Sequence, residues 1–250
     1  MAAPLLITIT FSHYCEKARW ALERAKIPYA ESGHLPVFHA FAVKRAGGKR
    51  ATPILVTDKG LIEDSTNILH WADRAAPEAH LYGRTDAERK EIETLEEYFD
   101  VHLGPHTRRW MYFHILPRRD LALTLVNHGE PALERAAFPV FFPLARAIMR
   151  RAMRINAPGY ERSAAKIEEV FSAVDKKLAD GRSFLVGDTL TAADITFATL
   201  AAVIVLPPEY SVKLPDLSEF PAEMAQQIRT WQERPAGAFA LRLFRDHRRG

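Results

Sequence analysis

A serine and a cysteine lie three residues apart in the segment FSHYCEKARWAL, residues 11–22. Ser12 and Cys15 fall where a strand is predicted to turn into a helix, so both belong to the first helical turn. Unpaired backbone N–H groups and the positive end of the helix dipole favour an anion there, either a thiolate of the protein or one from a bound ligand. Such a site lowers the pKa of a thiol. The pattern predicts thiol chemistry, although a helix-capping serine and a small buried cysteine would also fit it.

The elements that position this pair are predicted from hydrophobic periodicity. Residues 5–10, LLITIT, alternate apolar residues with threonine and favour a short buried strand. The spacing of Ala18, Ala21, Leu22 and Ala25 predicts a helix over residues 13–25. Further on, residues 53–62 predict a hairpin and residues 65–74 a helix.

The chain after residue 85 is predicted to be helical, whereas residues 28–50 show no clear periodicity. Residues 75–85, AAPEAHLYGRT, contain proline and glycine and few periodic apolar positions, which makes them a candidate linker. Residues 192–206 are apolar on nearly every side, as expected of a helix at the centre of a bundle. Thr191 and Asp194 at its start form a variant of the capping box.

Composition limits the class of protein. The 250 residues, 48% of them hydrophobic and 26% charged, are typical of a soluble globular protein with one or two domains. A net charge of +3 is too small to indicate nucleic-acid binding. Cys15 is the single cysteine, which excludes an intrachain disulfide and favours a cytoplasmic location. The first ten residues lack a signal-peptide pattern, and the longest apolar run, about 12 residues, is too short to span a bilayer.

Three segments make the chain resemble the cytosolic glutathione transferases over nearly its whole length: SHYCEKARWAL, TPILV followed by IEDSTNIL, and FLVGDTLTAADI. The resemblance implies a thioredoxin-like α/β domain over residues 1–78, a linker at 79–84 and an all-helical domain over 85–250. It also implies glutathione as a cosubstrate, a homodimer and no metal. Thr191 and Asp194, in the third segment, are then structural.

The resemblance also assigns glutathione contacts. Pro53 matches a proline that is cis in the family. The residue before it, Thr52, would pair through its backbone with the cysteine part of glutathione. Asp64 and Ser65 bind the γ-glutamyl end, although Glu63 leaves a one-residue ambiguity about the acid. A cation for the glycine carboxylate is expected among Lys44, Arg45, Lys49 and Arg50.

The resemblance leaves two catalytic residues open. Ser12 matches the position of the serine or cysteine that activates or attacks the glutathione sulfur, and its hydroxyl would hydrogen-bond a glutathione thiolate. Cys15 falls where glutaredoxins keep a second cysteine, so it would allow thiol–disulfide exchange. Tyr14 is a third candidate hydroxyl. A serine hydroxyl cannot readily form a mixed disulfide, so its favoured role is to hydrogen-bond a glutathione thiolate and lower the pKa of that thiol. We favour Ser12 in this role as the catalytic residue.

The pocket for the second substrate is expected between the two domains. Its predicted lining comes from the first long helix, which Gly104 and Pro105 kink or break: His102, His106, Arg109, Trp110 and Phe113. Residues 116–158 form a longer connection than the family's compact pattern. Three roles are open for this segment: it packs as an extra helix, it forms the wall of a large substrate site, or it contacts a membrane surface through an amphipathic basic helix.

The sequence therefore favours a glutathione transferase that activates bound glutathione as a thiolate and transfers it to a small hydrophobic electrophile. One alternative is a glutathione-dependent peroxidase or thiol–disulfide reductase that uses Cys15. Another is a noncatalytic protein of the same fold that binds glutathione or hydrophobic ligands. The expected partners include no nucleic acid, and contact with a membrane surface is not favoured.

Overall fold

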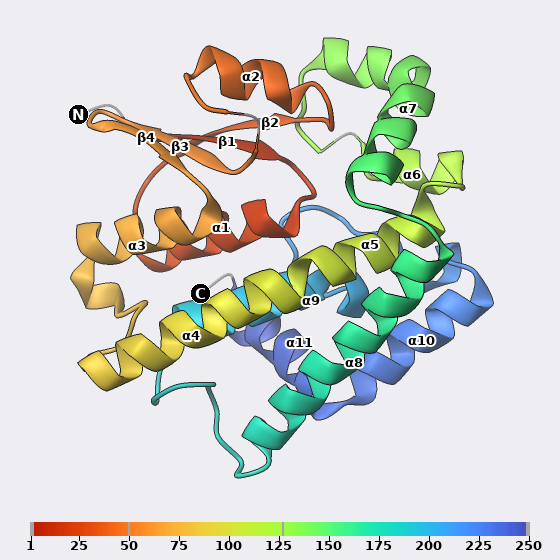
Figure 1. The fold of residues 1–250 in the computed structure, drawn as a ribbon. Helices are drawn as coiled ribbons and strands as arrows, with labels where there is room; N and C mark the ends of the chain where they lie inside the picture. The colour runs from red at the N-terminus through yellow and green to blue at the C-terminus, as the bar shows by residue number, and fades with distance from the viewer. Residues whose placement is uncertain (1–2, 50, 127, 249–250) are drawn as a thin grey trace.

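The computed structural model describes residues 3–49, 51–126 and 128–248. An N-terminal unit of one sheet and three helices leads through a short 3-10 helix into a helical unit (Figure 1). The N-terminal elements are β1 (Leu5–Ile9), α1 (His13–Arg24), β2 (Ala30–His34), α2 (His39–Arg45), β3 (Ile54–Thr57), β4 (Gly60–Glu63), α3 (Ser65–Ala75) and η1 (Pro77–Ala79). The helical elements are α4 (Asp86–His102), α5 (Gly104–Ile115), α6 (Arg119–Thr124), α7 (Ala132–Ala152), α8 (Ala157–Leu178), α9 (Ala192–Val205), η2 (Leu217–Glu219), α10 (Ala222–Glu233) and α11 (Pro235–His247).

The sheet has the order β2-β1-β3-β4, with β1 parallel to β2 and antiparallel to β3. Strands β3 and β4 form the predicted hairpin. Leu6 and Leu55 face the main core, whereas Ile7 and Ile54 pack with Val43 of α2 on the other face. Helices α1 and α3 cover one face and α2 the other (Figure 1). This arrangement confirms the predicted thioredoxin-like fold followed by an all-helical unit.

Helix α9 is the centre of the helical unit. All its residues but Val203 are buried, as its uniformly apolar composition predicts. The Asp194 carboxylate accepts from the backbone N–H groups of Thr191 at 2.9 Å and Leu185 at 2.8 Å. These bonds satisfy donors at the start of the helix and in the preceding loop, which confirms the structural role of the capping motif.

The first long helix breaks where the sequence predicts. Helix α4 ends at His102 and α5 begins at Gly104. A Cβ atom at Gly104 would lie 2.3 Å from the Tyr14 hydroxyl oxygen, so a side chain here would collide with α1. The glycine thus permits the close approach of the helical unit to the first turn of α1.

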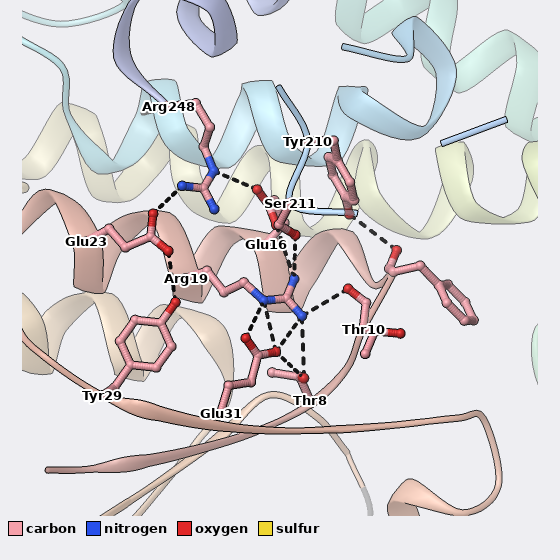
Figure 2. Close-up of polar contacts among 11 residues, drawn as sticks. Thr8, Thr10, Glu16, Arg19, Glu23, Tyr29, Glu31, Tyr210, Ser211 and Arg248 are labelled. Atoms are coloured by element: carbon pink, nitrogen blue, oxygen red, sulfur yellow. Dashed lines mark hydrogen bonds and ion pairs between the residues drawn. The ribbon is translucent and has the colours of Figure 1, made fainter. Parts of the chain in front are cut away.

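Buried polar contacts join the two units along α1. Lys17 lies 2.9 Å from a Glu96 carboxylate oxygen and 2.7 Å from one of Asp100, both on α4. On the other side of α1, Glu16 accepts from Arg19 at 3.1 Å and from Arg248 at 2.6 Å (Figure 2). The chain end is therefore fixed to the N-terminal unit.

Helix α7 lies beside α2, and α6 lies beyond α7 near the end of α5 (Figure 1). The Glu134 carboxylate accepts from the backbone N–H of Leu35 at 2.9 Å and contacts His34 Nδ1 at 2.6 Å. The rings of Phe38 and Phe141 meet edge to face at 6.0 Å. The long connection therefore packs against the N-terminal unit. In the described parts of the chain, no helix is both long and apolar enough to cross a membrane.

Candidate functional site

A cavity of about 570 Å³ lies between the C-terminal end of β1 with the loops beside it and helices α5 and α7 of the helical unit. This volume is within the range of small-molecule sites, about 300–1,000 Å³. The N-terminal unit contributes polar groups to its wall, and the helical unit and α7 contribute mainly apolar ones. The polar lining residues from the N-terminal unit are Ser12, His13, His39, Lys44, Lys49 and Thr52.

Ser12 lies at the junction of β1 and α1 and lines the cavity. It is the residue before the first helical turn, with an extended backbone, yet its side chain makes no capping hydrogen bond to that turn. The side chain is half-buried. A ligand in the cavity therefore meets a hydroxyl at the positive end of the α1 dipole.

Cys15 differs from the sequence-based expectation of an activated thiol. Its side chain is fully buried and is not part of the cavity wall. Burial raises the pKa of the Cys15 thiol, and the opposing effects of Arg19 and of hydrogen bonds with Ser12 and Thr52 are smaller. The expected low pKa is wrong because the side chain is fully buried, where a thiolate is poorly solvated.

The third strand brings a second backbone feature to the cavity. The peptide bond between Thr52 and Pro53 is cis, as the resemblance implies, and Thr52 lines the cavity. The Asp64 backbone N–H donates to the Pro53 carbonyl at 3.3 Å, which places the start of α3 beside this turn. Asp64 and Ser65 do not themselves line the cavity.

The structure separates the two acids that the sequence left ambiguous. Asp64 precedes α3 at a φ of 79° and accepts from the Thr66 N–H at 2.9 Å, with its side chain exposed. Glu63 instead accepts from the Lys49 N–H at 2.7 Å and holds the loop before the cis peptide. Asp64 therefore keeps a solvent-facing carboxylate oxygen for a ligand, whereas Glu63 has a structural partner.

Two of the four candidate cations lie at the cavity. Lys44 on α2 and Lys49 in the following loop contribute to its wall, and both are exposed enough to meet an anionic ligand group. Arg45 does not line the cavity. Arg50 is outside the described residues.

The predicted substrate-facing residues of the first long helix lie elsewhere. Arg109 donates to the Met153 carbonyl at 2.7 Å and to Ser163 at 2.9 Å, and His106 contacts the same serine. Trp110 is buried against Trp231, and Phe113 stacks on Tyr160 of α8. These side chains face α8, α10 and the end of α7, so they do not line the cavity. His102, which the sequence also predicts to line the pocket, lies on α4 against Tyr98 and outside the cavity wall.

The face of α5 that does line the cavity carries Arg108, Met111, Tyr112 and Ile115. Their spacing of three, four and seven residues is that of one helical face. The sequence signal was present, but a second apolar stripe on the same helix competed with it. The packing of α5 against α8 decides which of these two faces of α5 is turned towards the cavity.

Arg108 and His13 are functional candidates that the sequence did not single out. The Arg108 guanidinium lies 5.6 Å from the centre of the Tyr14 ring, and its Nε is buried without a hydrogen-bond partner in the described residues. His13 is 2% exposed, and burial followed by the charge of Arg108 lowers its pKa well below the usual value. A neutral imidazole and an arginine without a carboxylate partner make this end of the cavity receptive to an anion.

The long connection supplies the opposite wall. Leu125, before α7, and Ile148, Met149, Ala152 and Met153, at the end of α7, face the cavity. Of the hypotheses for residues 116–158, this placement supports both an extra packed helix and a substrate wall. Methionines and branched apolar side chains make a wall that adapts to apolar ligands.

Comparison with known proteins agrees with this architecture. The family model for the glutathione S-transferase N-terminal domain matches residues 6–80, and the model for the C-terminal domain matches residues 136–227. The two models follow one another in the order of the two structural units. The chain belongs to the glutathione S-transferase superfamily. No curated protein matches its sequence.

Solved structures share the fold over nearly the whole chain. A glutathione S-transferase from Methylobacterium radiotolerans, in complex with glutathione sulfonate, is 22% identical with a TM-score of 0.56, covering 95% of this chain and 94% of its own. A Methylobacillus flagellatus glutathione S-transferase with glutathione bound is 18% identical with a TM-score of 0.52, covering 95% and 98%. Glutathione transferase F2 from Populus trichocarpa is 12% identical with a TM-score of 0.59, covering 97% and 99%.

Proposed function

We propose that the protein is a glutathione transferase that binds glutathione along the N-terminal unit and transfers it, through a new carbon–sulfur bond, to an apolar electrophile. The observation that carries this proposal is the position of Ser12. Its hydroxyl lies at the N-terminus of α1, makes no cap bond and lines a cavity shared with Thr52 and its cis peptide. Relatives of the same fold hold glutathione sulfonate or glutathione, which supports the choice of ligand.

The binding interactions follow from the groups around Ser12. The Thr52 backbone pairs with the cysteine part of glutathione, while Asp64 and Ser65 receive the γ-glutamyl end. A carboxylate accepts hydrogen bonds from the ligand ammonium, and a serine hydroxyl with helix N-terminal N–H groups donates to its carboxylate. Lys44 and Lys49 are the candidate partners of the glycine carboxylate.

In the chemical step, the Ser12 hydroxyl donates a hydrogen bond to the glutathione sulfur and stabilises its thiolate, whose proton leaves to solvent. The α1 dipole and the Arg108 charge favour the same anion. The thiolate then attacks an electrophilic carbon, forming a carbon–sulfur bond while a leaving group departs or a double bond or ring opens. The walls formed by α5 and α7 hold the apolar part of the acceptor.

The Cys15 alternative has less support. A buried thiol with a raised pKa is a poor nucleophile at neutral pH, since the thiolate is the reactive form. Exchange with a glutathione disulfide also requires access along the sulfur–sulfur axis, and Cys15 is outside the cavity wall. We therefore assign Cys15 a packing role beneath Ser12 and Thr52.

The test is the ultraviolet titration of the bound thiol, together with conjugation rates for a panel of aromatic halides and epoxides. We expect the pKa of glutathione bound to the wild-type protein to lie below that of free glutathione. Ser12→Ala should return the pKa towards the free value and lower kcat by about 10²-fold, the effect of losing one donor to a developing anion. Cys15→Ala is the matched control and should change both quantities much less than Ser12→Ala does, since only a contact with the Ser12 side chain is lost.

The other outcomes separate the remaining functions. Glutathione binding without a lowered thiol pKa would indicate a noncatalytic binding protein. Disulfide reductase activity that Cys15→Ala abolishes would replace the transferase with the redox alternative. Absence of glutathione binding would remove the proposed function altogether.

A further inference from the structure

Large apolar side chains on the protein surface are concentrated on α7. Leu133 and Val140 are 81% and 78% exposed, and Phe141, Leu144 and Ile148 are each about half exposed. Phe41 of the neighbouring α2 adds a sixth exposed apolar group. A patch of this kind on a soluble protein marks an interaction surface.

This exposed stripe is not the packing face of α7. Residues 133, 140, 144 and 148 recur at spacings of four and seven, so they share one side of the helix. Phe138, Phe142 and Ala145 lie on the opposite side and are buried against the molecule. The helix is thus apolar on two faces, only one of which has a partner in the described structure.

Arginines border the C-terminal half of the stripe. A surface hollow of about 600 Å³ is lined by five of them, Arg146, Arg150, Arg151, Arg154 and Arg162, and by no acidic residue. Within the described residues, none of these guanidinium groups makes an ion pair or a side-chain hydrogen bond. The positive potential also reaches Arg109, whose pKa is lowered by burial and by the charges of Arg162, Arg108 and Arg154.

The apolar stripe and the arginines together define the chemistry of the partner. Arg151 continues the stripe seven residues after Leu144, whereas Arg146 and Arg150 are turned further round the helix and line the adjoining hollow. A partner must therefore bury apolar side chains and supply several anionic groups over one helix length. A second copy of this face would bring the arginines together without countercharges, which disfavours self-association through it.

We infer that the α7 stripe and its arginines form a docking surface for an anionic lipid bilayer. The side chains of Leu133, Val140, Leu144 and Ile148 enter the boundary between headgroups and acyl chains, and the arginines contact lipid phosphates. Helix α7 lies in the plane of the membrane surface and does not cross it.

The proposed docking surface adjoins the cavity. Phe41 and Ile148 belong both to the exposed patch and to the cavity wall, so the patch borders the cavity. Docking therefore gives an apolar acceptor a path from the bilayer to the glutathione sulfur. This consequence rests on the proposed function, whereas membrane binding does not.

The inference is tested by cosedimentation of the full-length protein with vesicles of phosphatidylcholine alone or with 30% phosphatidylglycerol, a composition chosen to carry roughly one anionic lipid in three. We expect binding to the anionic vesicles that weakens with salt, and much weaker binding to the neutral ones. Arg150→Gln with Arg151→Gln should weaken binding by about 10- to 30-fold, and Val140→Gln with Leu144→Gln by a similar factor. All four side chains are exposed, so these changes leave the fold intact.

Matched surface variants provide the control. Arg229→Gln on α10 and Val101→Gln on α4 remove an exposed arginine and an exposed valine away from the patch, and they should bind vesicles as the wild type does. Absence of binding to anionic vesicles, or equal binding to neutral ones, would overturn the inference. So would a lipid-free dimer that Val140→Gln with Leu144→Gln dissociates in sedimentation velocity, because the stripe would then be a contact between two copies. Glutathione titration of the same variants should be unchanged, which separates this test from the proposed function.

Discussion

Ser12 and Cys15 differ in environment although they share one helical turn. Ser12 faces the cavity, whereas Cys15 points into the core and has a raised pKa. Three residues along a helix correspond to most of a turn, but the side-chain directions still differ by about 60°. That angle is enough to place a hydroxyl in the site and a thiol beneath it. Burial therefore assigns the two residues different roles.

One buried and one half-buried histidine predict how stability changes with pH. Burial and then Arg109 lower the pKa of His106 to about 4, and His13 is shifted in the same direction. Unfolded histidine titrates near pH 6.5, so between about pH 6.5 and 4 the unfolded chain binds more protons than the folded protein. The free energy of unfolding must therefore fall as the pH falls through this range.

His106→Gln should reduce this acid dependence. The variant lacks one group that takes up a proton only on unfolding, so the slope of the free energy of unfolding against pH should decrease by up to one proton between pH 6.5 and 4. Urea denaturation at a series of pH values measures that slope. Above pH 7.5 the curves of the two proteins should run parallel. An unchanged acid slope would show that His106 is not held neutral by the fold.

Helix α5 illustrates how one element serves two surfaces. Its cavity face carries Arg108, Met111, Tyr112 and Ile115, and its other face packs Trp110 and Phe113 against neighbouring helices. Helix α7 completes the cavity from the far side with Ile148 and Met149. The selectivity for acceptors should therefore depend on two helices that are separated by the connection around α6.

Met149→Trp should narrow the acceptor part of the cavity. Because Met149 faces the cavity from α7, the larger side chain should raise KM for bulky acceptors by about tenfold, as expected for a steric clash in an apolar pocket. The affinity for glutathione should be unchanged, since its expected contacts lie on the N-terminal unit. Steady-state kinetics with acceptors of increasing size measure the effect.

Leu144→Trp is the matched control for this change, since it enlarges a side chain on the outward face of the same helix. It should leave KM unchanged in lipid-free assays. Equal effects of both substitutions would contradict the assignment of the Met149 side as the substrate wall.

Polar contacts along α1 add to the apolar core that the two units share, and the C-terminal end of α11 takes part in them. Figure 2 shows Arg19 bridging Glu16 and Glu31, with Arg248 reaching Glu16 and Glu23. Glu16 and Arg248 are almost fully buried. Removing Arg248 leaves the buried Glu16 carboxylate with one cationic partner fewer in a poorly solvated place.

Arg248→Ala should therefore destabilise the protein by about 3 kcal/mol, near the lower end for breaking a buried pair, because Glu16 keeps Arg19. Guanidinium denaturation monitored by fluorescence and circular dichroism measures the change. Arg245→Ala is the control, since Arg245 pairs with Asp246 on the surface, and it should change stability by no more than about 0.5 kcal/mol. If the two variants were equally stable, the chain end would not fasten the N-terminal unit.

The sequence by itself determined the elements and their local signals. The β1–α1 turn, the β3–β4 hairpin, the break at Gly104 and the Asp194 capping motif all follow from patterns within about a dozen residues. These features depend on backbone preferences and on hydrogen bonds between near neighbours, which local spacing encodes. The three motifs also led to the correct family.

The tertiary structure decided which side chains share the cavity. Arg108 lines the cavity, whereas Arg109 is turned away from it. The reason is that Met153 and Ser163, some 45 to 55 positions further along the chain, accept hydrogen bonds from Arg109. Cys15 lost its expected reactivity through packing around the helix start. The wall from α7 depends on its contacts with His34, Leu35 and Phe38, about 100 positions away in sequence. Helix rotation and burial are set by such distant partners, so periodicity alone leaves them undetermined.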